Sequence, residues 1–323
     1  MRRNIISVTL NPSIDVTLWT DGMDFDATNR VLRETREVGG KGINVSRVIH
    51  SCGLDSLCLT VAGEDNSREL ADYLEMDGLH YELLKITGAV RENLTLRYEE
   101  NTMKLNRKGP FLSVMMISAL MALIQSRMNQ GDIVVFAGSL PENVSVQDYV
   151  ELMLAVKQAG ALVVVDSDML TLEDYRRVSP WLIKPNIHEL RRIVPVEGTQ
   201  TEDIAAAATV LQESGVENVL VSLGGDGLIC VNRDCIVHAT VPQVEVKSTV
   251  GAGDSALAGY VVGFVKEYGV EECVRLAAAC GTACATMDGT AVATREAAME
   301  LLDQIQIERT ARPRPVETAE ETV

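Results

Sequence analysis

The sequence is short of positive charge. Its 323 residues include 29 Lys and Arg against 46 Asp and Glu, which gives a formal net charge of −17. No cluster of Lys and Arg offsets this balance, so nucleic acid, whose phosphates such a chain repels, is excluded as a partner. An anionic ligand would need basic residues that are placed singly in its pocket.

The sequence also lacks the spacings of common metal and redox sites. Its seven cysteines contain no Cys-x-x-Cys pair, and its four histidines show no ligand spacing, so we expect reduced, buried thiols and no metal held by these residues. The opening stretch MRRNIISVTLNPSIDV has only a short apolar run, which predicts neither a signal peptide nor a membrane span. A Walker A sequence is absent as well. We therefore expect a cytoplasmic protein without a membrane partner.

What the sequence does contain is the pattern of an α/β protein. Hydrophobic residues make up 46% of the chain, enough to bury a large core. Runs rich in Val, Ile and Leu predict strands at 4–10, 57–63, 132–138, 161–167, 181–186, 218–225 and 228–233. Helical patterns lie between them at 42–53, 67–78, 113–128, 146–160 and 202–215. The alternation predicts a doubly wound, mostly parallel sheet that is flanked by helices.

Residues 93–107 break this rhythm. Apolar and polar residues alternate from Leu94 to Leu105 around a Glu-Glu-Asn turn, which is typical of a β-hairpin. We predict that segments at about 15–30 and 90–107 form a small β-sheet that stands off the main domain as a lid.

The remaining organisation is simple. We find no internal repeat, so residues 1–307 are expected to form a single domain. The segment 308–323 is polar and contains proline, which predicts a disordered tail.

Four polar stretches follow predicted strands, at the edge where a doubly wound sheet binds its ligand. They are NPSIDV (11–16), VGGKGINVSR (38–47), KPNIHEL (184–190) and STVGAGDS (248–255). Taken alone, each is compatible with a purely structural role: Asp15 could cap a turn, Gly39 and Gly40 could form one, and Lys41 could be solvated. The GAGDSA segment fits a loose dinucleotide pattern, but the apolar segments after it are helical and leave no strand for a ribose-binding acid.

The combination of residues in STVGAGDS is more informative. Backbone amides of Gly251, Ala252 and Gly253 at a helix start would point at negative charge, aided by the helix dipole. A bound anion would repel a carboxylate at this place, so Asp254 must act on something else. The fitting task is to take a proton from a hydroxyl that attacks the phosphorus held by those amides. An anion hole beside a general base predicts phosphoryl transfer to an alcohol.

Five motifs together resemble one enzyme family. In their order and separation, GGKGINVSR, GSLP, KPNIHEL, SLGGDG and STVGAGDS are similar to the motifs of ribokinase-like sugar kinases of the phosphofructokinase B family. The resemblance covers residues 4–303. Within the family, TLNPSIDVT, the lysine in GGKGIN and STVGAGDS resemble the 1-phosphofructokinases, with the tagatose-6-phosphate kinases as near neighbours.

This resemblance implies ATP and Mg²⁺ and assigns roles on the nucleotide side. Asp254 matches the catalytic base, and Gly251, Ala252 and Gly253 match the anion hole for the γ-phosphoryl group. The implied nucleotide site consists of Lys184, Asn186, Glu189, Ser222, Gly224, Gly225 and Gly227. Within this site Asn186 and Glu189 would hold Mg²⁺, through water.

The resemblance also assigns the sugar side. The residues that match groups around the sugar are Asp15, Gly39, Gly40, Asn44 and Ser139. Lys41 and Arg91, with Asn93, fit the site for a phosphate that the substrate already carries, and Arg30 would join them from the lid. A dianion needs localised positive charge and forked donors, whereas a neutral sugar would leave buried cations unpaired at a cost of about 1 to 3 kcal/mol or more. We therefore expect a phosphosugar as the acceptor.

The expected reaction is ATP-dependent phosphorylation of D-fructose 1-phosphate at its 6-hydroxyl. Two alternatives remain open, a sister kinase for tagatose 6-phosphate or fructose 6-phosphate and a non-catalytic sugar-phosphate sensor. The chain departs from the family at 137–143, where SGSLPPG becomes AGSLPEN, and at Val90 in place of threonine; both changes bear on the identity of the sugar. The resemblance further implies a homodimer through the lid and a monovalent cation such as K⁺ near Ser248 and Val250.

Overall fold

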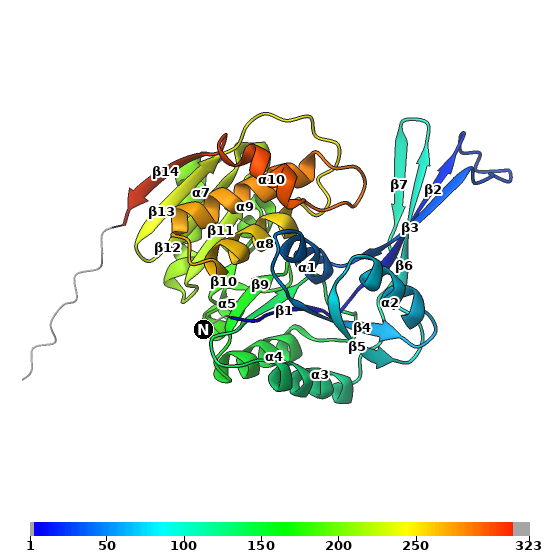
Figure 1. Ribbon diagram of the computed structural model, residues 1–323, viewed down its shortest axis with the longest axis horizontal. Coiled ribbons are helices and arrows are strands. Elements are labelled where there is room, and N and C mark those ends of the chain that lie inside the picture. The colour runs from blue at the N-terminus through cyan, green and yellow to red at the C-terminus, as the bar shows by residue number, and fades with distance from the viewer. Residues whose placement is uncertain (1–2, 313–323) are drawn as a thin grey trace, which may run out of the picture.

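A ten-stranded sheet forms the centre of the protein in the computed structural model, which describes residues 3–312 (Figure 1). The strand order is β14 (Gln306–Ala311), β13 (Cys235–Thr240), β12 (Leu228–Asn232), β11 (Asn218–Ser222), β10 (Leu182–Ile183), β9 (Leu162–Asp166), β8 (Ile133–Ala137), β1 (Ile5–Thr9), β4 (Leu57–Gly63) and β5 (His80–Ile86). Strands from β11 to β5 pair in parallel, and β12, β13 and β14 extend one edge antiparallel. The predicted doubly wound, mostly parallel sheet is confirmed.

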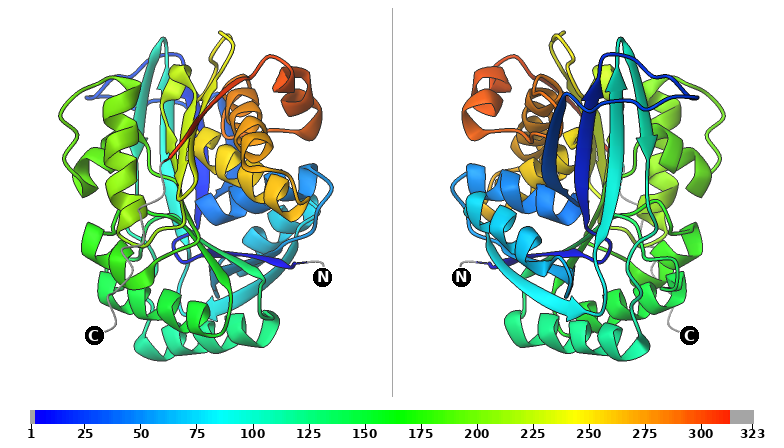
Figure 2. Two further views of the ribbon diagram at one scale, coloured as in Figure 1. Left: turned by 90° about the vertical axis from the view of Figure 1, so that its left-hand side faces the viewer. Right: turned by 90° about the vertical axis from the view of Figure 1, so that its right-hand side faces the viewer.

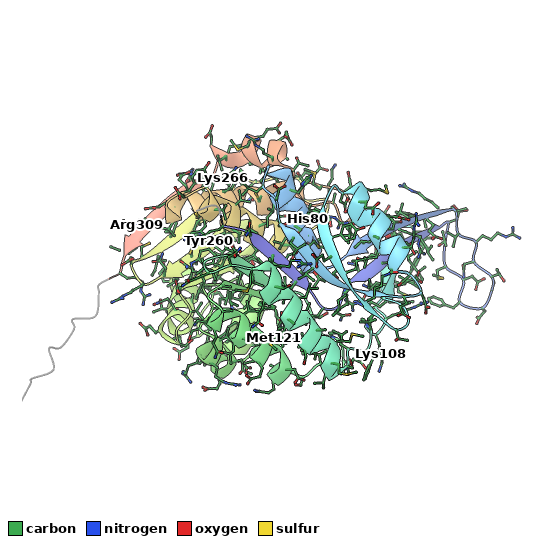
Figure 3. The ribbon with its side chains drawn as sticks, turned by 60° about the horizontal axis from the view of Figure 1, so that its bottom comes forward. His80, Lys108, Met121, Tyr260, Lys266 and Arg309 are labelled. Carbon is green, nitrogen blue, oxygen red and sulfur yellow. The ribbon has the colours of Figure 1, made fainter. Side chains whose placement is uncertain are left out.

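Helices cover both faces of this sheet (Figure 2). One layer contains α3 (Val114–Arg127), α4 (Val146–Gln158), α5 (Leu172–Val178), α6 (Ile187–Ile193) and α7 (Thr201–Glu213); the other contains α1 (Lys41–Ser51), α2 (Ser67–Met76), α8 (Ala252–Val265), α9 (Val270–Ala285) and α10 (Arg295–Leu302). Figure 3 shows α3, with Met121, on the face that is brought forward. In the described part of the chain, no helix is both long and apolar enough to cross a membrane.

The central strands are buried on both faces, which explains their continuous apolar sequence. Along β8, Val134 and Phe136 pack into one core cluster while Ile133 and Val135 pack into the other. Side chains of a strand alternate between its two faces, so a strand between two helical layers needs apolar residues at every position.

A second sheet of four strands projects from the main body (Figure 1). Its order is β3 (Arg33–Gly39), β2 (Ser13–Thr20), β6 (Arg91–Tyr98) and β7 (Asn101–Leu105), and β2 pairs with β6 in parallel. This lid sheet contains the predicted hairpin of β6 and β7. Its inner end packs on the main body, where Ile14 and Val16 join Leu70 and Leu74 of α2 in a third core cluster.

The structure differs from the prediction at strands on or next to the edges of the two sheets. β3, β5, β13 and β14 were not predicted: β3 and β14 are largely polar, β5 is an edge strand of mixed character, and only every second residue of β13 is buried. Residues 308–311 are not part of a disordered tail as predicted, since they belong to β14 and pair with β13. Without β14, strand β13 would leave its own backbone groups unpaired at the sheet edge. The rest of the predicted tail, from residue 313, lies outside the described residues.

Glycines line the contact between α8 and α9 and let the two helices pack closely. A Cβ atom on Gly259 would stand 2.8 Å from the Leu276 carbonyl oxygen, and one on Gly263 would stand 3.0 Å from Cys273 Cα. Backbone atoms cannot yield to such contacts as flexible side chains do. The small residues therefore fix the position of α8 against its neighbour.

We predict that Gly259→Val destabilises the protein by about 1 to 3 kcal/mol, because the new side chain would overpack the contact between α8 and α9. The matched control is Gly22→Val, since the nearest atom to a Cβ there is Glu99 Oε1 at 3.9 Å. The control should stay within about 0.5 kcal/mol of the parent protein. Urea unfolding of both variants measures the difference, and equal free energies of unfolding would contradict the close packing.

Candidate active site

A cavity of about 980 Å³ lies between the carboxyl ends of the parallel strands and the base of the lid sheet. Every site residue that we predicted from the sequence lines this cavity, with the exception of Arg30 and of Ser248 at the predicted cation site. The side chain of Arg30 is exposed in the segment between β2 and β3. The structure therefore brings the predicted motifs together and leaves Arg30 outside the site.

Helix α8 begins at this cavity and carries Asp254 in its first turn. Gly251 is the N-cap residue and has a φ of 79°, in the left-handed region that favours glycine. A Cβ atom on Gly253 would lie only 2.8 Å from Lys184 Nζ, so glycine lets this ammonium group approach the helix start. The N–H of Ala252 makes a long bond of 3.4 Å to the Thr249 carbonyl. The helix N-terminus and Lys184 together form a positive pole suited to an anion.

A buried carboxylate, that of Asp166 at the end of β9, holds two lysines in the cavity. Its Oδ1 accepts a hydrogen bond of 2.9 Å from Lys41 Nζ, and its Oδ2 lies 3.4 Å from Lys184 Nζ. Asp166 is 2% exposed and Lys184 is 4% exposed. Burial by itself would raise the pKa of Asp166, but the ammonium groups of Lys184 and Lys41 outweigh it and hold the pKa below its ordinary value. Asp166 is therefore ionised at neutral pH.

Asp254 has the opposite balance. Burial, and next the negative charge of Asp166, raise the pKa of Asp254 to about 6, although the hydrogen bond from Asn44 and the charges of Lys41 and Lys184 lower it. The Asn44 amide donates from Nδ2 to Asp254 Oδ2 at 2.8 Å. A carboxyl group with this pKa is largely ionised at neutral pH and is a stronger base than an ordinary aspartate.

The base of the lid sheet supplies a second set of polar groups. Asp15 Oδ1 accepts hydrogen bonds from Ser13 Oγ at 2.8 Å and from Asn93 Nδ2 at 2.9 Å. Asp15 and Asn93 face each other because β2 and β6 pair in parallel with these two residues in register. These bonds fix the Asp15 carboxylate, and its other oxygen can accept hydrogen bonds from a ligand.

Arg91 stands at the start of β6 with few partners. Its Nη2 donates to the Asn11 carbonyl at 3.3 Å, and its buried Nε has no hydrogen-bond partner. Burial lowers the pKa of Arg91, and the charge of Asp15 offsets only part of this effect. A half-buried guanidinium with unused donors is suited to a phosphate or carboxylate ligand.

Other buried polar atoms in the cavity also lack partners. Among the described residues these include Asn11 Oδ1 and Asn93 Oδ1. Asn11 is otherwise well held, since its Nδ2 donates to Ser139 Oγ at 3.0 Å and to the Leu140 carbonyl at 3.1 Å. Because buried polar groups are normally paired, these oxygens are unsatisfied acceptors beside the cavity, and neither has accessible surface of its own.

Lys41 does not turn to Arg91, with which we predicted a phosphate clamp. Its ammonium donates instead to Asp166, and this interaction raises the pKa of Lys41 although burial lowers it. The charges of Asp254 and Glu189 act on Lys41 in the same direction as Asp166. Lys41 therefore lies at the end of the cavity where Asp254 and Lys184 meet.

The opposite side of the cavity is formed by the start of α6 and by the segment after β11. Asn186 is the N-cap of α6: its Oδ1 accepts from the Glu189 N–H at 2.9 Å, and its own N–H donates to Glu189 Oε2 at 2.8 Å. The lining continues through Ser222, Gly224, Gly225 and Gly227, around the short 3₁₀ helix η1 (Gly224–Asp226). This capping box gives the N-x-x-E motif a structural role in addition to any role in binding.

Oxygen donors on this side suit Mg²⁺. Glu189 uses only Oε2 in the capping box, which leaves its Oε1 for an ion or for a water bound to one. Mg²⁺ prefers oxygen ligands and usually keeps several waters beside one or two carboxylates and the phosphates of its substrate. The donor set therefore fits the ion, with Asn186 and Glu189 as the residues that would hold it. In the described part of the chain, no cluster of three or more His, Cys, Asp or Glu forms a protein-only metal cage.

Two important residues were missed by reasoning from the sequence. Asp166 is the last residue of β9, and a polar residue at the carboxyl end of a buried strand was the available signal. Asn11 lies within the NPSIDV stretch, where only Asp15 was considered. Their partners are far away in sequence, because Lys41 is 125 residues from Asp166 and Ser139 is 128 residues from Asn11.

Comparisons with known proteins agree with this geometry. A family model described as pfkB family carbohydrate kinase matches residues 4–297. The chain is 33% identical to a 1-phosphofructokinase of Bacillus subtilis (strain 168) over 305 residues, which cover 94% of this chain and 99% of that protein. It is 28% identical to a tagatose-6-phosphate kinase of Staphylococcus epidermidis over 306 residues, with coverage of 94% and 99%.

Solved structures show the same relationship. Phosphofructokinase-2 from Escherichia coli in complex with potassium superposes with a TM-score of 0.86 and 28% sequence identity, covering 94% of this chain and 99% of that one. The match covers nearly the full length of each chain. The chain therefore belongs to the pfkB family of carbohydrate kinases and is a phosphotransferase that acts on a sugar hydroxyl.

Proposed function

We propose that the protein transfers the γ-phosphoryl group of ATP to the 6-hydroxyl of D-fructose 1-phosphate, which gives fructose 1,6-bisphosphate. The observation that carries this proposal is the buried Asp254 carboxylate at the start of α8, beside the backbone amides and the ammonium of Lys184. The choice of sugar is supported by the 33% identical relative named 1-phosphofructokinase.

The lid end of the cavity would bind the sugar phosphate. Arg91 offers unused donors to the 1-phosphate, and the Asp15 carboxylate, held by Asn93, accepts from sugar hydroxyls. A ligand anchored at this end would extend toward α8. Its far hydroxyl would then meet Asp254.

The opposite end would carry out the transfer. Asp254 takes the proton of the 6-hydroxyl as the oxygen attacks phosphorus, and the amides of Gly251, Ala252 and Gly253 face the charge on the transferring group. Lys184 and Lys41 add positive charge at the same place. Mg²⁺, when bound near Asn186 and Glu189, supplies further positive charge to the phosphate oxygens of ATP.

A tagatose-6-phosphate kinase is the second candidate, because a relative with that name is 28% identical over nearly the same length. The chemistry at Asp254 would be the same. Family membership speaks against a non-catalytic sensor. The homodimer through the lid and a bound K⁺ stay predictions, the latter supported by the potassium complex of the Escherichia coli relative.

The acceptor can be identified with a panel of phosphosugars. With ATP and Mg²⁺, we expect kcat/KM for fructose 1-phosphate to exceed that for tagatose 6-phosphate and fructose 6-phosphate by at least about tenfold, which corresponds to about 1.4 kcal/mol. Phosphorus NMR of the product would show the new phosphate on carbon 6. A higher kcat/KM with tagatose 6-phosphate would replace the proposed substrate with the second candidate.

Asp254→Asn tests the general base. The substitution keeps the size and an acceptor for Asn44 but cannot take a proton, so kcat should fall by on the order of 10² to 10⁴ while ATP binding is kept. Rapid-quench kinetics and nucleotide titration measure the two effects. Unchanged turnover would remove the assignment.

The pH profile provides a separate test. Because the base must be ionised and the pKa of Asp254 is about 6, kcat/KM should fall as pH drops through about 6 and level off above it. The phosphate of the substrate also titrates near pH 6, so the residual activity of Asp254→Asn is the control. The substrate's own titration would persist in that variant, whereas the contribution of Asp254 would disappear.

Arg91→Met tests the phosphate site. Loss of the guanidinium should raise KM for the phosphosugar by about 10- to 100-fold, since hydrogen bonds to charged groups contribute roughly 1.5 to 3 kcal/mol. The matched control is Arg97→Met on the same strand, because Arg97 is exposed and stacks over Trp19 instead of lining the cavity. If Arg91→Met changed KM for ATP and left the phosphosugar unaffected, the site would be misplaced.

A further inference from the structure

A chain of polar contacts leads from Asp254 along one face of helix α1 to the end of α2. Asn44 Nδ2 donates to Asp254 Oδ2 at 2.8 Å, and Arg47 Nη1 donates to Asn44 Oδ1 at 3.1 Å. Arg47 Nε in turn donates to Asp77 Oδ2 at 2.7 Å. The contacts connect α8, α1 and the end of α2, and their outer part lies outside the cavity described above.

The periodicity of α1 makes this arrangement possible. Asn44 and Arg47 are three residues apart in α1 and therefore lie on the same face of the helix. The guanidinium of Arg47 offers only donors, and the ionised Asp254 offers only acceptors. Only one orientation of the Asn44 amide satisfies both neighbours, with its oxygen toward Arg47 and its nitrogen toward Asp254. The reverse orientation would face oxygen with carboxylate and N–H with N–H.

Arg47 is itself held on several sides. In addition to Asp77, its Nη1 donates to the Val38 carbonyl at 2.8 Å, next to the glycines that precede α1. The side chain is 15% exposed. It borders a second cavity of about 500 Å³, which shares only Val38 and Thr290 with the substrate cavity and is formed by β3, α1, α2 and residues 290–292. A guanidinium with three fixed acceptors cannot turn freely, so its contact with Asn44 is a fixed one.

We propose that Arg47 is a positioning residue for phosphoryl transfer: it fixes the Asn44 amide so that its nitrogen faces Asp254 and leaves the other carboxylate oxygen for the acceptor hydroxyl. This inference rests on the proposed role of Asp254 as the general base. Within residues 3–312, Arg47 neither lines the substrate cavity nor bonds to Asp254, since its acceptors are Asp77, Val38 and Asn44. Its effect on the reaction would therefore pass through Asn44.

The charges around Asp254 set the direction of the expected effect. The groups that face it are Asp166 from β9, Lys41 and Asn44 from α1, Lys184 after β10 and the Cys284 thiol from α9. Burial is the largest influence and raises the pKa, whereas the bond from Asn44 lowers it. If Asn44 lost its orientation, the pKa of Asp254 would rise further. The base would then be protonated over a wider range of pH.

The groups around Arg47 are also defined. Asp77 comes from the end of α2, and the second cavity adds Arg36 and Glu37 of β3, His50 of α1 and Tyr73 of α2. Arg36 is bound to acids of its own, with Nε on Glu69 at 2.7 Å and Nη2 on Glu92 at 2.5 Å. Because Arg36 borders the same cavity but is held by these acids and not by Asn44, it is a matched control for Arg47.

The test is the dependence of kcat/KM on pH for Arg47→Met, measured with the phosphosugar from about pH 5 to 9. We expect the acid side of the profile to move up by about 0.5 to 1 pH unit, the equivalent of one net hydrogen bond. Activity should be several-fold below that of the parent enzyme near pH 6 and should recover at about pH 8.5. A residue with only a structural role would lower activity equally at all pH values, and that result would overturn the proposal.

Three variants complete the design. Arg36→Met should leave the profile in place, and an equal shift in this control would contradict a specific role of Arg47.

In an Asn44→Ala background, Arg47→Met should produce no additional shift; an additional shift would show that Arg47 acts by another route. Arg47→Lys serves if Arg47→Met does not fold, because it keeps the positive charge beside Asp77 but cannot donate from two separate nitrogens. It should shift the profile in the same direction.

Failure of this inference can be told from failure of the proposed function. If the acid side of the profile of Asp254→Asn were the same as that of the parent enzyme, with no contribution lost beyond the titration of the substrate, Asp254 would not be the base and both proposals would fall. If Asp254→Asn kept only the titration of the substrate while Arg47→Met left the profile unmoved, only the role of Arg47 would be overturned. Thermal melting of every variant separates these outcomes from loss of folded protein.

Discussion

The site depends on the burial of four charged groups that nearly cancel one another. Asp166 and Asp254 are acids, Lys41 and Lys184 are cations, and of the four only Lys41 keeps substantial contact with solvent. Removing a charge from water is costly unless a partner compensates for it. The sheet provides these partners. Strands β9 and β10 are neighbours, so Asp166 and Lys184 at their carboxyl ends lie side by side. Helices α1 and α8 begin at the same edge of the sheet, with Lys41 and Asp254 in their first turns.

Much of the fold could be predicted because the central strands are covered on both sides. β8 and β9 are short, continuous runs of apolar residues, and a run of this kind is typical of a strand that is buried on both faces. The prediction failed where burial is partial. β3 has the sequence RETREVG and β14 the sequence QIERTA, and their pairing is set by a neighbouring strand that supplies backbone hydrogen bonds, not by their own side chains.

The candidate site likewise combines residues that are adjacent in sequence with residues that are far apart in sequence. The glycine-rich start of α8 and its aspartate are adjacent in sequence, so their chemistry could be read directly. Asn44 contacts Asp254 across 210 residues and Lys41 contacts Asp166 across 125, and no spacing in the sequence indicates such pairs. Arg30 was assigned to the site through the family resemblance, whereas the segment that carries it turns its side chain to solvent.

The glycine contact between α8 and α9 has a mechanical consequence. Because the main chains of the two helices meet there without intervening side chains, a shift of α8 toward α9 would bring backbone atoms into collision. The lid sheet, by contrast, projects from the body and is anchored at one end only (Figure 1). A closure around the proposed sugar site would therefore come from the lid sheet, with α8 held in place by its contact with α9.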